Sequence, residues 1–432
     1  MRLRRKSNPP MLHSLLVFWG RARHTIATVG MKTTNRQKEI GPTPGGSPVQ
    51  TTDHYGVLGV DFSLSTDNTH VREFFRAAYR RFLRAEGKGE FLAMTAMLGP
   101  GTPNPFVQAA AARLELGGRS MPENRAFLFL LNALMDRVSD FLVVHGAAFS
   151  IGDRGFILAG PPTAGKSTLA LELGRKGAVF FSDDVAPLNR ATGMLHPFPR
   201  AIGVRRNATA SSWFDVEKLP TSSVHTLPHK WLVDAEALGL KVASPQAPPV
   251  RVESVFYLST EGGGVSGPAR QATVADRHLE IALAEPDKAV LEELGSIPGV
   301  SRLAAADASL FPLFTFSVSR SAHAMLAIAD LCRRHRDVVL FLDEQRPLHP
   351  DRPSDPIISE AKWSSLLIEL ARELLNRSET GFVMKSCGNL AGLVSELSRV
   401  LSGARAWRLQ SGDPGRTADL ILELTGGRRS AA

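Results

Sequence analysis

Eight consecutive residues, from Gly160 to Ser167, match the pattern G-x-x-x-x-G-K-[ST], which suits a bound nucleoside triphosphate. The glycines allow backbone conformations that other residues resist, so that successive N–H groups can point at phosphate oxygens. Lys166 supplies a positive charge, and Ser167 supplies a hydroxyl that can ligate Mg²⁺. The residues predicted to bind the nucleotide are Gly160, Pro161, Pro162, Thr163, Ala164, Gly165, Lys166, Ser167 and Thr168.

The segments on either side of this loop follow the order that phosphate binding requires. Residues 155–159 form a short apolar run typical of a buried parallel strand, and residues 168–176 predict a helix that Gly177 ends. This order puts the positive end of the helix dipole at the phosphates. The alternative, a glycine-rich turn that binds nothing, leaves the Lys-Ser pair without a purpose.

Two adjacent carboxylates, Asp183 and Asp184, follow the next apolar run, residues 178–181. In a parallel α/β sheet the ligand crevice lies at the carboxyl ends of the strands, so we expect the pair beside the loop. Neighbouring side chains leave a strand in opposite directions, which would aim one carboxylate at Mg²⁺ and the other at an incoming hydroxyl. The alternative role is that of turn or cap residues. His145 ends a strand predicted over 141–144 and reaches the same edge if that strand neighbours the strand of the loop.

The net charge of +9 over 432 residues is concentrated at the N-terminus. Residues 1–50 hold nine Lys or Arg against Glu39, which is +8, and the rest of the chain holds 42 basic and 41 acidic residues, which is +1. We therefore expect no nucleic-acid partner. The apolar run 11–19 is too short to span a bilayer, and no signal cleavage site follows it, so no membrane partner is expected and Met31 is an alternative start.

Cysteine and histidine usage bounds the chemistry further. The two cysteines, Cys332 and Cys387, lie far apart and outside any metal-ligand spacing, which favours a cytoplasmic location. The histidines form no H-E-x-x-H pattern, so a zinc site is not expected.

Hydrophobic periodicity predicts further elements. Leu58, Val60, Phe62 and Leu64 alternate with small or polar residues and predict a half-buried strand. Strands are also predicted over 252–258 and 338–342, and helices over 71–82, 123–140, 279–294, 361–375 and 390–401. The arginines of the first helix are expected to form a solvated face; they are Arg72, Arg76, Arg80, Arg81 and Arg84.

Four ordered motifs resemble the C-terminal catalytic domain of HPr kinase/phosphorylase and the bacterial kinases related to it. They span about 60 residues and consist of His145-Gly-Ala-Ala, Gly160 to Thr168, Leu169-Ala-Leu-Glu-Leu with Gly177 and Asp183-Asp184, and Pro197-Phe-Pro-Arg200-Ala-Ile-Gly-Val204. The resemblance implies an α/β fold with a P-loop-containing core of the HPr kinase type, a smaller α/β N-terminal region and a disordered basic tail. The expected boundaries are 1–52 for the tail and linker, 53–140 for the N-terminal region, 141–424 for the catalytic region and 425–432 for a second tail.

The resemblance also implies roles for the residues that match. One Asp of the pair, Asp183 or Asp184, would act as base toward a substrate hydroxyl, and His145 would support that site. Ser167 and Asp184 would ligate Mg²⁺, and Arg200 would lie near the phosphates or the substrate. The implied activity is that of an ATP-dependent kinase, with a serine of a protein or peptide as the expected acceptor and with homo-oligomers common among the relatives.

The chain departs from this family in two places. Thr168 stands where the bifunctional enzymes have Glu, as it does in the kinase-like relatives, so phosphorolysis is not expected. Residues 53–140 do not resemble the N-terminal domain of the bifunctional enzymes, so HPr itself is not the expected acceptor.

Two other interpretations stay open at this point. Residues 338–344 end in Asp343-Glu344 after an apolar run and look like a conventional Walker B strand, which would indicate an AAA or transporter ATPase with Asp343 on Mg²⁺ and Glu344 polarising water. A nucleotide-binding module without turnover would use the loop but would have no use for the acidic pair.

Overall fold

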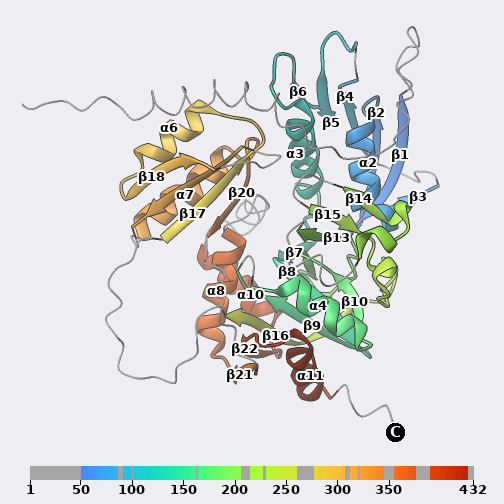
Figure 1. The fold of residues 1–432 in the computed structure, drawn as a ribbon, viewed down its shortest axis with the longest axis vertical. Coiled ribbons are helices and arrows are strands. Elements are labelled where there is room, and N and C mark those ends of the chain that lie inside the picture. The colour runs from blue at the N-terminus through green and yellow to red at the C-terminus, as the bar shows by residue number, and fades with distance from the viewer. Residues whose placement is uncertain are drawn as a thin grey trace, which may run out of the picture.

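The computed structural model describes residues 50–85, 91–99, 101–161, 164–205, 215–226, 230–259, 277–306, 312–319, 322–344, 355–375 and 390–426. Their strands form four β-sheets with helices packed against them (Figure 1), so the α/β class expected from the sequence is confirmed. Most of the predicted basic tail lies outside the described residues, and the first strand already begins at Thr51. None of the helices in the described parts of the chain combines the length and apolar character needed to cross a bilayer.

The N-terminal unit, residues 50–135, is a six-stranded sheet with two helices. The strand order is β3-β1-β2-β4-β5-β6. The elements are β1 (Thr51–Val57), β2 (Val60–Thr66), α2 (Thr69–Ala78), the 3₁₀ turn η1 (Arg80–Phe82), β3 (Leu83–Arg84), β4 (Leu92–Met97), β5 (Phe106–Ala109), β6 (Ala112–Glu115) and α3 (Pro122–Met135).

Three predicted elements of this unit have different bounds in the structure. Leu58 and Gly59 are not in a strand; they form the turn between β1 and β2, with φ values of 48° and 80°. The helix predicted over 71–82 ends at Ala78, because the chain leaves helical geometry at Tyr79, where φ is −118° and ψ is 23°. The helix predicted to reach residue 140 ends at Met135.

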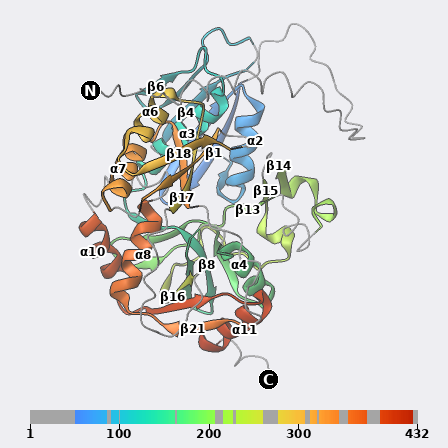
Figure 2. The ribbon, with the colours of Figure 1, turned by 60° about the vertical axis from the view of Figure 1, so that its left-hand side comes forward.

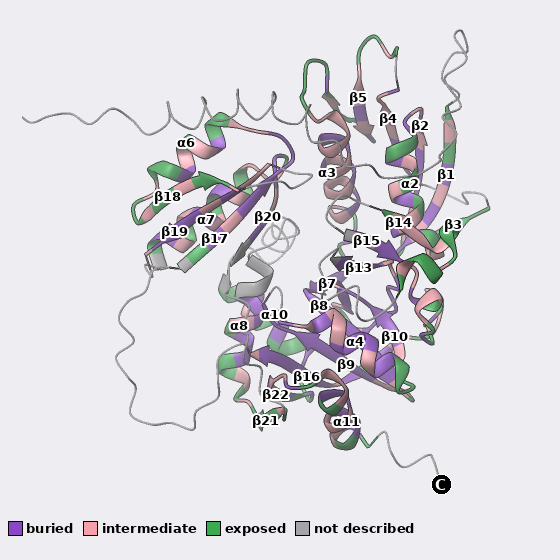
Figure 3. Ribbon diagram, viewed as in Figure 1, coloured by how far each residue is buried: buried purple, intermediate pink, exposed green. Residues whose placement is uncertain are grey.

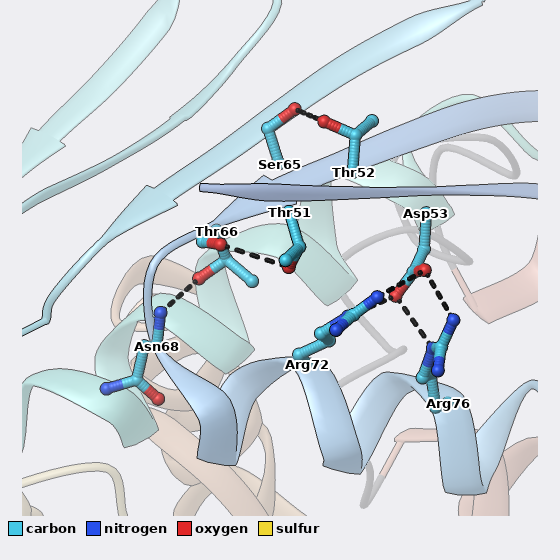
Figure 4. A network of polar contacts seen from close by, with 8 residues as sticks. All are labelled: Thr51, Thr52, Asp53, Ser65, Thr66, Asn68, Arg72 and Arg76. Atoms are coloured by element: carbon cyan, nitrogen blue, oxygen red, sulfur yellow. Dashed lines mark hydrogen bonds and ion pairs between the residues drawn. The ribbon is translucent and has the colours of Figure 1, made fainter. Parts of the chain in front are cut away.

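The arginines of α2, η1 and β3 bind carboxylates and a carbonyl. Arg76, Arg80 and Arg84 are exposed, as the predicted solvated face requires, whereas Arg72 and Arg81 are half-buried. Arg72 and Arg76 both donate to the buried carboxylate of Asp53, at distances of 3.0 Å and 2.9 Å (Figure 4). Burial raises the pKa of Asp53, but the hydrogen bonds from the two arginines outweigh it and hold the pKa below its usual 3.8. The other three pairs are Arg80 with the Ser222 carbonyl, Arg81 with Asp234 and Glu236, and Arg84 with Asp61. Arg72 and Arg76 thus attach α2 to β1, and Arg80 and Arg81 attach η1 to residues 222–236.

The central sheet has nine strands, and it carries the glycine-rich loop. Its path is β10-β8-β9-β16-β12-β11-β7, with β22 added beside β16 and β21 beside β22. Strands β9, β16 and β22 run parallel to one another, whereas β8 runs antiparallel to β9. The strands are β7 (Phe141–Val144), β8 (Gly146–Ile151), β9 (Arg154–Ala159), β10 (Val179–Ser182), β11 (Ala186–Asn189), β12 (Met194–Leu195), β16 (Val250–Ser259), β21 (Ile357–Glu360) and β22 (Arg405–Gln410).

Helices cover both faces of the central sheet. Helices α8 (Trp363–Leu375) and α10 (Leu390–Val400) pack Leu366 and Leu393 into the core of one face. Helices α4 (Lys166–Arg175) and α11 (Pro414–Leu424) pack Leu169 and Ile421 into the core of the other face. Figure 3 shows that β8, β9 and β16 are mostly buried, which explains why their sequences read as nearly continuous apolar runs, whereas β21 and β22 are more exposed.

Two smaller sheets complete the fold. A three-stranded sheet contains β13 (Ile202–Arg205), β14 (Val224–Thr226) and β15 (Lys230–Val233). The inserted lobe, formed by the described residues between 277 and 344, has a four-stranded sheet in the order β18-β19-β17-β20. Its elements are β17 (Arg277–Leu283), α6 (Lys288–Ser296), β18 (Val300–Ala305), β19 (Leu313–Val318), α7 (Ala322–Arg334) and β20 (Val339–Glu344).

The inserted lobe overturns one prediction and separates another from the loop. The helix predicted from residue 279 is wrong there, because 279–283 belong to strand β17 and the helix begins only at Lys288. Leu279, Ile281 and Leu283 alternate with less apolar residues and are buried in the lobe's own core, as a strand requires. Strand β20, which carries Asp343 and Glu344, pairs with β17 and is not part of the sheet that contains β9, so it does not occupy a Walker B position.

The inserted lobe lies beside α3 (Figure 2), and polar contacts attach it to α3 and to the residues flanking that helix. Arg336 donates to Asp136 at 2.6 Å, and Arg119 donates to Glu285 at 2.7 Å. The buried side chain of Arg125 donates to the carbonyl of Asp337 at 2.7 Å. The lobe is thus held by ion pairs and hydrogen bonds, while its apolar side chains face its own core.

Replacing Asp53 by Asn should destabilise the protein by about 1 to 3 kcal/mol, since two guanidinium groups would lose their counter-charge. Asp61→Asn is the matched control, because it removes a more exposed pair with Arg84 and should cost less than about 1 kcal/mol. Urea denaturation at pH 7 measures both. Equal losses in the two variants would contradict a special contribution from the buried carboxylate.

Candidate functional site

The loop between β9 and α4 has a backbone that only glycine allows at two positions. Gly160 has a φ of 142°, and a Cβ there would lie 2.7 Å from the carbonyl oxygen of Leu258. Gly165, with a φ of 99°, is the residue that precedes α4 and has no side chain to cap the helix. The first N–H groups of α4 are therefore available to an anion, and no acidic residue occupies the first turn. Pro162 and Thr163, two of the predicted binding residues, lie outside the described residues.

Lys166 is folded back over this loop. Its ammonium donates to the carbonyl of Gly160 at 2.8 Å and to that of Pro161 at 3.1 Å, and the residue is only 6% exposed. Carbonyl oxygens satisfy a buried ammonium less well than an anion does, because they carry only partial charge. A phosphate oxygen at the N-terminus of α4 would therefore compete well for this donor.

Ser167 and Asp183 meet although 15 residues separate them. The Ser167 hydroxyl donates to Oδ1 of Asp183 at 2.9 Å. Asp183 is buried, and its Oδ2 has no hydrogen-bond partner in the described part of the chain. The family resemblance implied that Asp184 ligates the metal with Ser167, whereas the structure brings Ser167 to Asp183. Residue Thr168, the last of the predicted binding residues, is half-buried in the first turn of α4.

The environment of Asp183 disfavours its charged form. Burial raises the pKa of Asp183 from its usual 3.8 to about 7, with a further contribution from the negative charge of Asp184. The hydrogen bond from Ser167 and the positive charges of Lys166 and Arg200 act in the opposite direction. The site thus contains a carboxylate that would gain from an additional cation.

Asp184 has a backbone conformation that is uncommon for residues other than glycine. Its φ is 62°, in the left-handed region, which Asp and Asn tolerate better than most side chains. Its carbonyl accepts hydrogen bonds from the ring Nδ1 of His145 at 2.9 Å and from the N–H of Gly146 at 3.3 Å. These two contacts hold the acidic pair against the start of β8. Asp184 itself is half-buried, in contrast to Asp183.

His145 lies beside the loop, as predicted, but for a different reason. The expectation required β7 to neighbour β9, whereas β7 lies at one end of the sheet path and β10 at the other. His145 instead joins β7 to β8, and β8 runs antiparallel to β9, so that Gly146 pairs with Ala159 directly before the loop. The start of β8 and the end of β9 therefore lie at the same edge.

Arg200 contributes a positive charge from the segment after β12. Its guanidinium lies 5.6 Å from the centre of the Tyr79 ring and 5.8 Å from that of Phe198. It also lowers the pKa of Asp183, so its charge acts on the buried carboxylate. The sequence alone does not single out Tyr79. It occurs at helical spacing with the other apolar residues of 71–82, and no local pattern links it to Arg200, which lies far along the chain.

The side chains at this edge suit Mg²⁺ bound together with phosphates. Mg²⁺ prefers oxygen ligands and is usually held by one or two carboxylates, with waters and phosphate oxygens completing the shell. The Ser167 hydroxyl and the Asp183 carboxylate, with its unpartnered Oδ2 in the described chain, provide such a set. Within the described residues, no cluster of three or more His, Cys, Asp or Glu could hold a metal without further ligands.

Replacing Asp183 by Asn should stabilise the ligand-free protein by about 1 to 3 kcal/mol at pH 8. The folded-state pKa lies above the usual value, so Asp183 destabilises the fold increasingly as the pH rises from about 4 to about 7. Asn keeps an acceptor for Ser167 and carries no charge. Denaturation in a chelator at pH 5 and pH 8 should show a larger gain at pH 8; a variant less stable than the wild type at pH 8 would contradict the prediction.

Comparisons with known proteins give little further information about the chain. No family model and no curated protein matches it. One solved structure that it resembles is that of the Hpr(Ser) kinase/phosphatase from Coxiella burnetii, with 18% sequence identity, 32% of this chain and 76% of that chain covered, and a TM-score of 0.19. A likeness of that size is too slight to support an activity.

Proposed function

We propose that the protein is an ATP-dependent kinase that transfers the γ-phosphate to a hydroxyl group, with a serine of a protein or peptide as the expected acceptor. The observation that carries this proposal is the contact between Ser167, in the first turn of α4, and the buried carboxylate of Asp183. It puts a helix N-terminus that can bind an anion next to a carboxylate that can bind a metal ion. A module that only binds nucleotide has no use for the second carboxylate of the pair, Asp184.

The loop residues would bind the triphosphate. The uncapped N–H groups of α4 would donate to phosphate oxygens, since they have no intrahelical partners. Lys166 would exchange the carbonyls of Gly160 and Pro161 for the phosphates, gaining a full negative charge in place of partial ones.

Ser167 and Asp183 would hold Mg²⁺, which supplies positive charge that offsets the charge developing on the transferred phosphoryl group. This role replaces the assignment of Asp184 to the metal, because Asp183 is the residue that Ser167 contacts. Arg200, whose charge reaches Asp183, would add to the same stabilisation.

Asp184 would serve as the base. It is the less buried carboxylate of the pair, and His145 and Gly146 fix its carbonyl. The acceptor oxygen forms a bond to the γ-phosphorus while the bond from that phosphorus to the oxygen bridging the β-phosphate breaks, and the acceptor proton passes to Asp184. ADP is the leaving group.

Three further features stay predictions from the sequence. They are the absence of phosphorolysis, which rests on Thr168, the cytoplasmic location and a homo-oligomeric state.

Lys166→Ala should weaken ATP binding about 10- to 100-fold, since it removes charge-assisted hydrogen bonds to the phosphates. Lys176→Ala is the matched control: it removes a lysine from the other end of α4, where it pairs with Asp419, and should leave affinity unchanged.

Asp184→Asn should leave binding intact and slow transfer at least about 100-fold. Fluorescent ATP analogues measure binding.

The decisive assay mixes the purified protein, Mg²⁺ and ATP radiolabelled in its γ-phosphate with a protein extract of the host cell. Labelled phosphoserine that depends on Lys166 and Asp184, but not on Lys176, supports the kinase. Release of labelled phosphate without an acceptor would indicate an ATPase, and tight binding without turnover would indicate a binding module. Either outcome overturns the proposal.

A further inference from the structure

A cluster of aromatic rings at the end of α2 lies against the side chain of Arg200. Arg200 is the charged residue of the segment 197–204. The Tyr79 ring stacks on Phe75, with centroids 5.8 Å apart, and lies 6.4 Å from Phe198. Phe82 lies 5.1 Å from Phe198. The Arg200 guanidinium is 5.6 Å from the Tyr79 ring centre, within the range of a cation–π interaction. The N-terminal unit therefore contacts Arg200 directly.

The break between α2 and η1 is what brings Tyr79 to this place. Helix α2 ends at Ala78, and Tyr79 is both its C-cap and the residue before η1. The N–H of Ala201 donates to the carbonyl of Ala78 at 3.3 Å, so the backbone beside Arg200 is attached to the same helix end. The chain around Arg200 is thus held at the backbone and at the side chain by one short segment.

The burial of Tyr79 makes this contact stronger than a surface contact would be. Tyr79 is 2% exposed and Phe198 4%, so the rings offer the guanidinium a water-poor face. A guanidinium that is already held against a buried ring loses little conformational entropy when it binds an anion, because its position is largely fixed beforehand. The N–H of Phe198 donates to the carbonyl of Phe181 at 2.8 Å, so the segment that carries Arg200 lies beside the end of β10, directly before the acidic pair.

We propose that Tyr79 is a positioning residue whose ring holds the Arg200 guanidinium for phosphoryl transfer, so that the N-terminal unit completes the site. This inference rests on the proposed kinase function. It assigns to the N-terminal unit a role in turnover and none in holding the nucleotide, which the loop and α4 bind.

Tyr79→Leu removes the ring, and it should lower kcat about five- to tenfold while the KM for ATP changes by less than about twofold. Tyr79→Phe keeps the ring and should restore kcat to within about twofold of the wild type. The rate measured is label transfer from γ-radiolabelled ATP to protein of the host extract. If Tyr79→Phe is as slow as Tyr79→Leu, the ring does not hold the guanidinium.

Tyr55→Leu is the control for general loosening of the N-terminal unit. Tyr55 is as buried as Tyr79, belongs to the same hydrophobic cluster and has its own ring contact with Phe62, 4.8 Å away. It should lower the Tm about as much as Tyr79→Leu and leave kcat unchanged. An equal fall in kcat for both variants would overturn the proposal.

A double-mutant cycle with Arg200→Met separates this proposal from the kinase proposal. Tyr79→Leu should have no further effect on kcat once Arg200 is replaced, and the Tm loss of the double variant should be smaller than the two single losses together. Additive effects on both readouts would overturn the role of Tyr79. If the wild type transfers no label, the kinase proposal fails, and the Tm cycle still decides whether the ring holds the guanidinium.

Discussion

Burying a carboxylate costs free energy unless hydrogen-bond donors and positive charges surround it, and Asp183 is buried with another carboxylate as its neighbour in the chain. Its compensation comes from separate segments: Ser167 and Lys166 from the start of α4, and Arg200 from beyond β12. That compensation is incomplete, since the pKa of Asp183 stays well above its usual value. An empty site with an incompletely compensated carboxylate lowers the stability of the fold, and binding of a cation and phosphates removes that cost. Binding sites commonly trade stability for function in this way.

The central sheet must curl to bring these segments together. The two strands at the ends of the path are β10 and β7, and a short connection links each of them to a strand near the opposite end. His145 alone joins β7 to β8, and the three residues from Asp183 to Val185 join β10 to β11. The two ends of the path therefore meet where His145 contacts the Asp184 carbonyl. Close approach is achieved by local features, a left-handed φ at Asp184 and the missing Cβ of Gly146, which would otherwise lie 2.6 Å from the Leu158 carbonyl. Such strain persists only where the surrounding structure imposes it.

The sequence predicted the features that depend on neighbours in the chain. The strand before the loop, the helix after it and the end at Gly177 follow from local pattern, and the structure confirms them. Contacts between residues far apart in the chain could not be predicted from these local patterns. Whether Asp183 or Asp184 meets Ser167 depends on how β10 enters the sheet, and Arg81 of η1 finds its partner Glu236 at a separation of 155 residues. The helix predicted from residue 279 is wrong over 279–283, because Leu279, Ile281 and Leu283 alternate as in a strand, and the strand that pairs with them, β19, follows only after α6 and β18.

The N-terminal unit contacts the central region through apolar side chains, whereas the inserted lobe contacts α3 through polar ones. This difference decides which of the two can position a side chain of the site. The core of the N-terminal unit continues into the central region, since Val143, Val185 and Phe198 belong to the same hydrophobic cluster as Tyr55 and Tyr79. The lobe has a core of its own and meets α3 through ion pairs and hydrogen bonds. Apolar burial fixes relative position more firmly than a polar contact that water and salt can replace. The unit that shares a core with the acidic pair is therefore the one able to hold a side chain such as Arg200 in place.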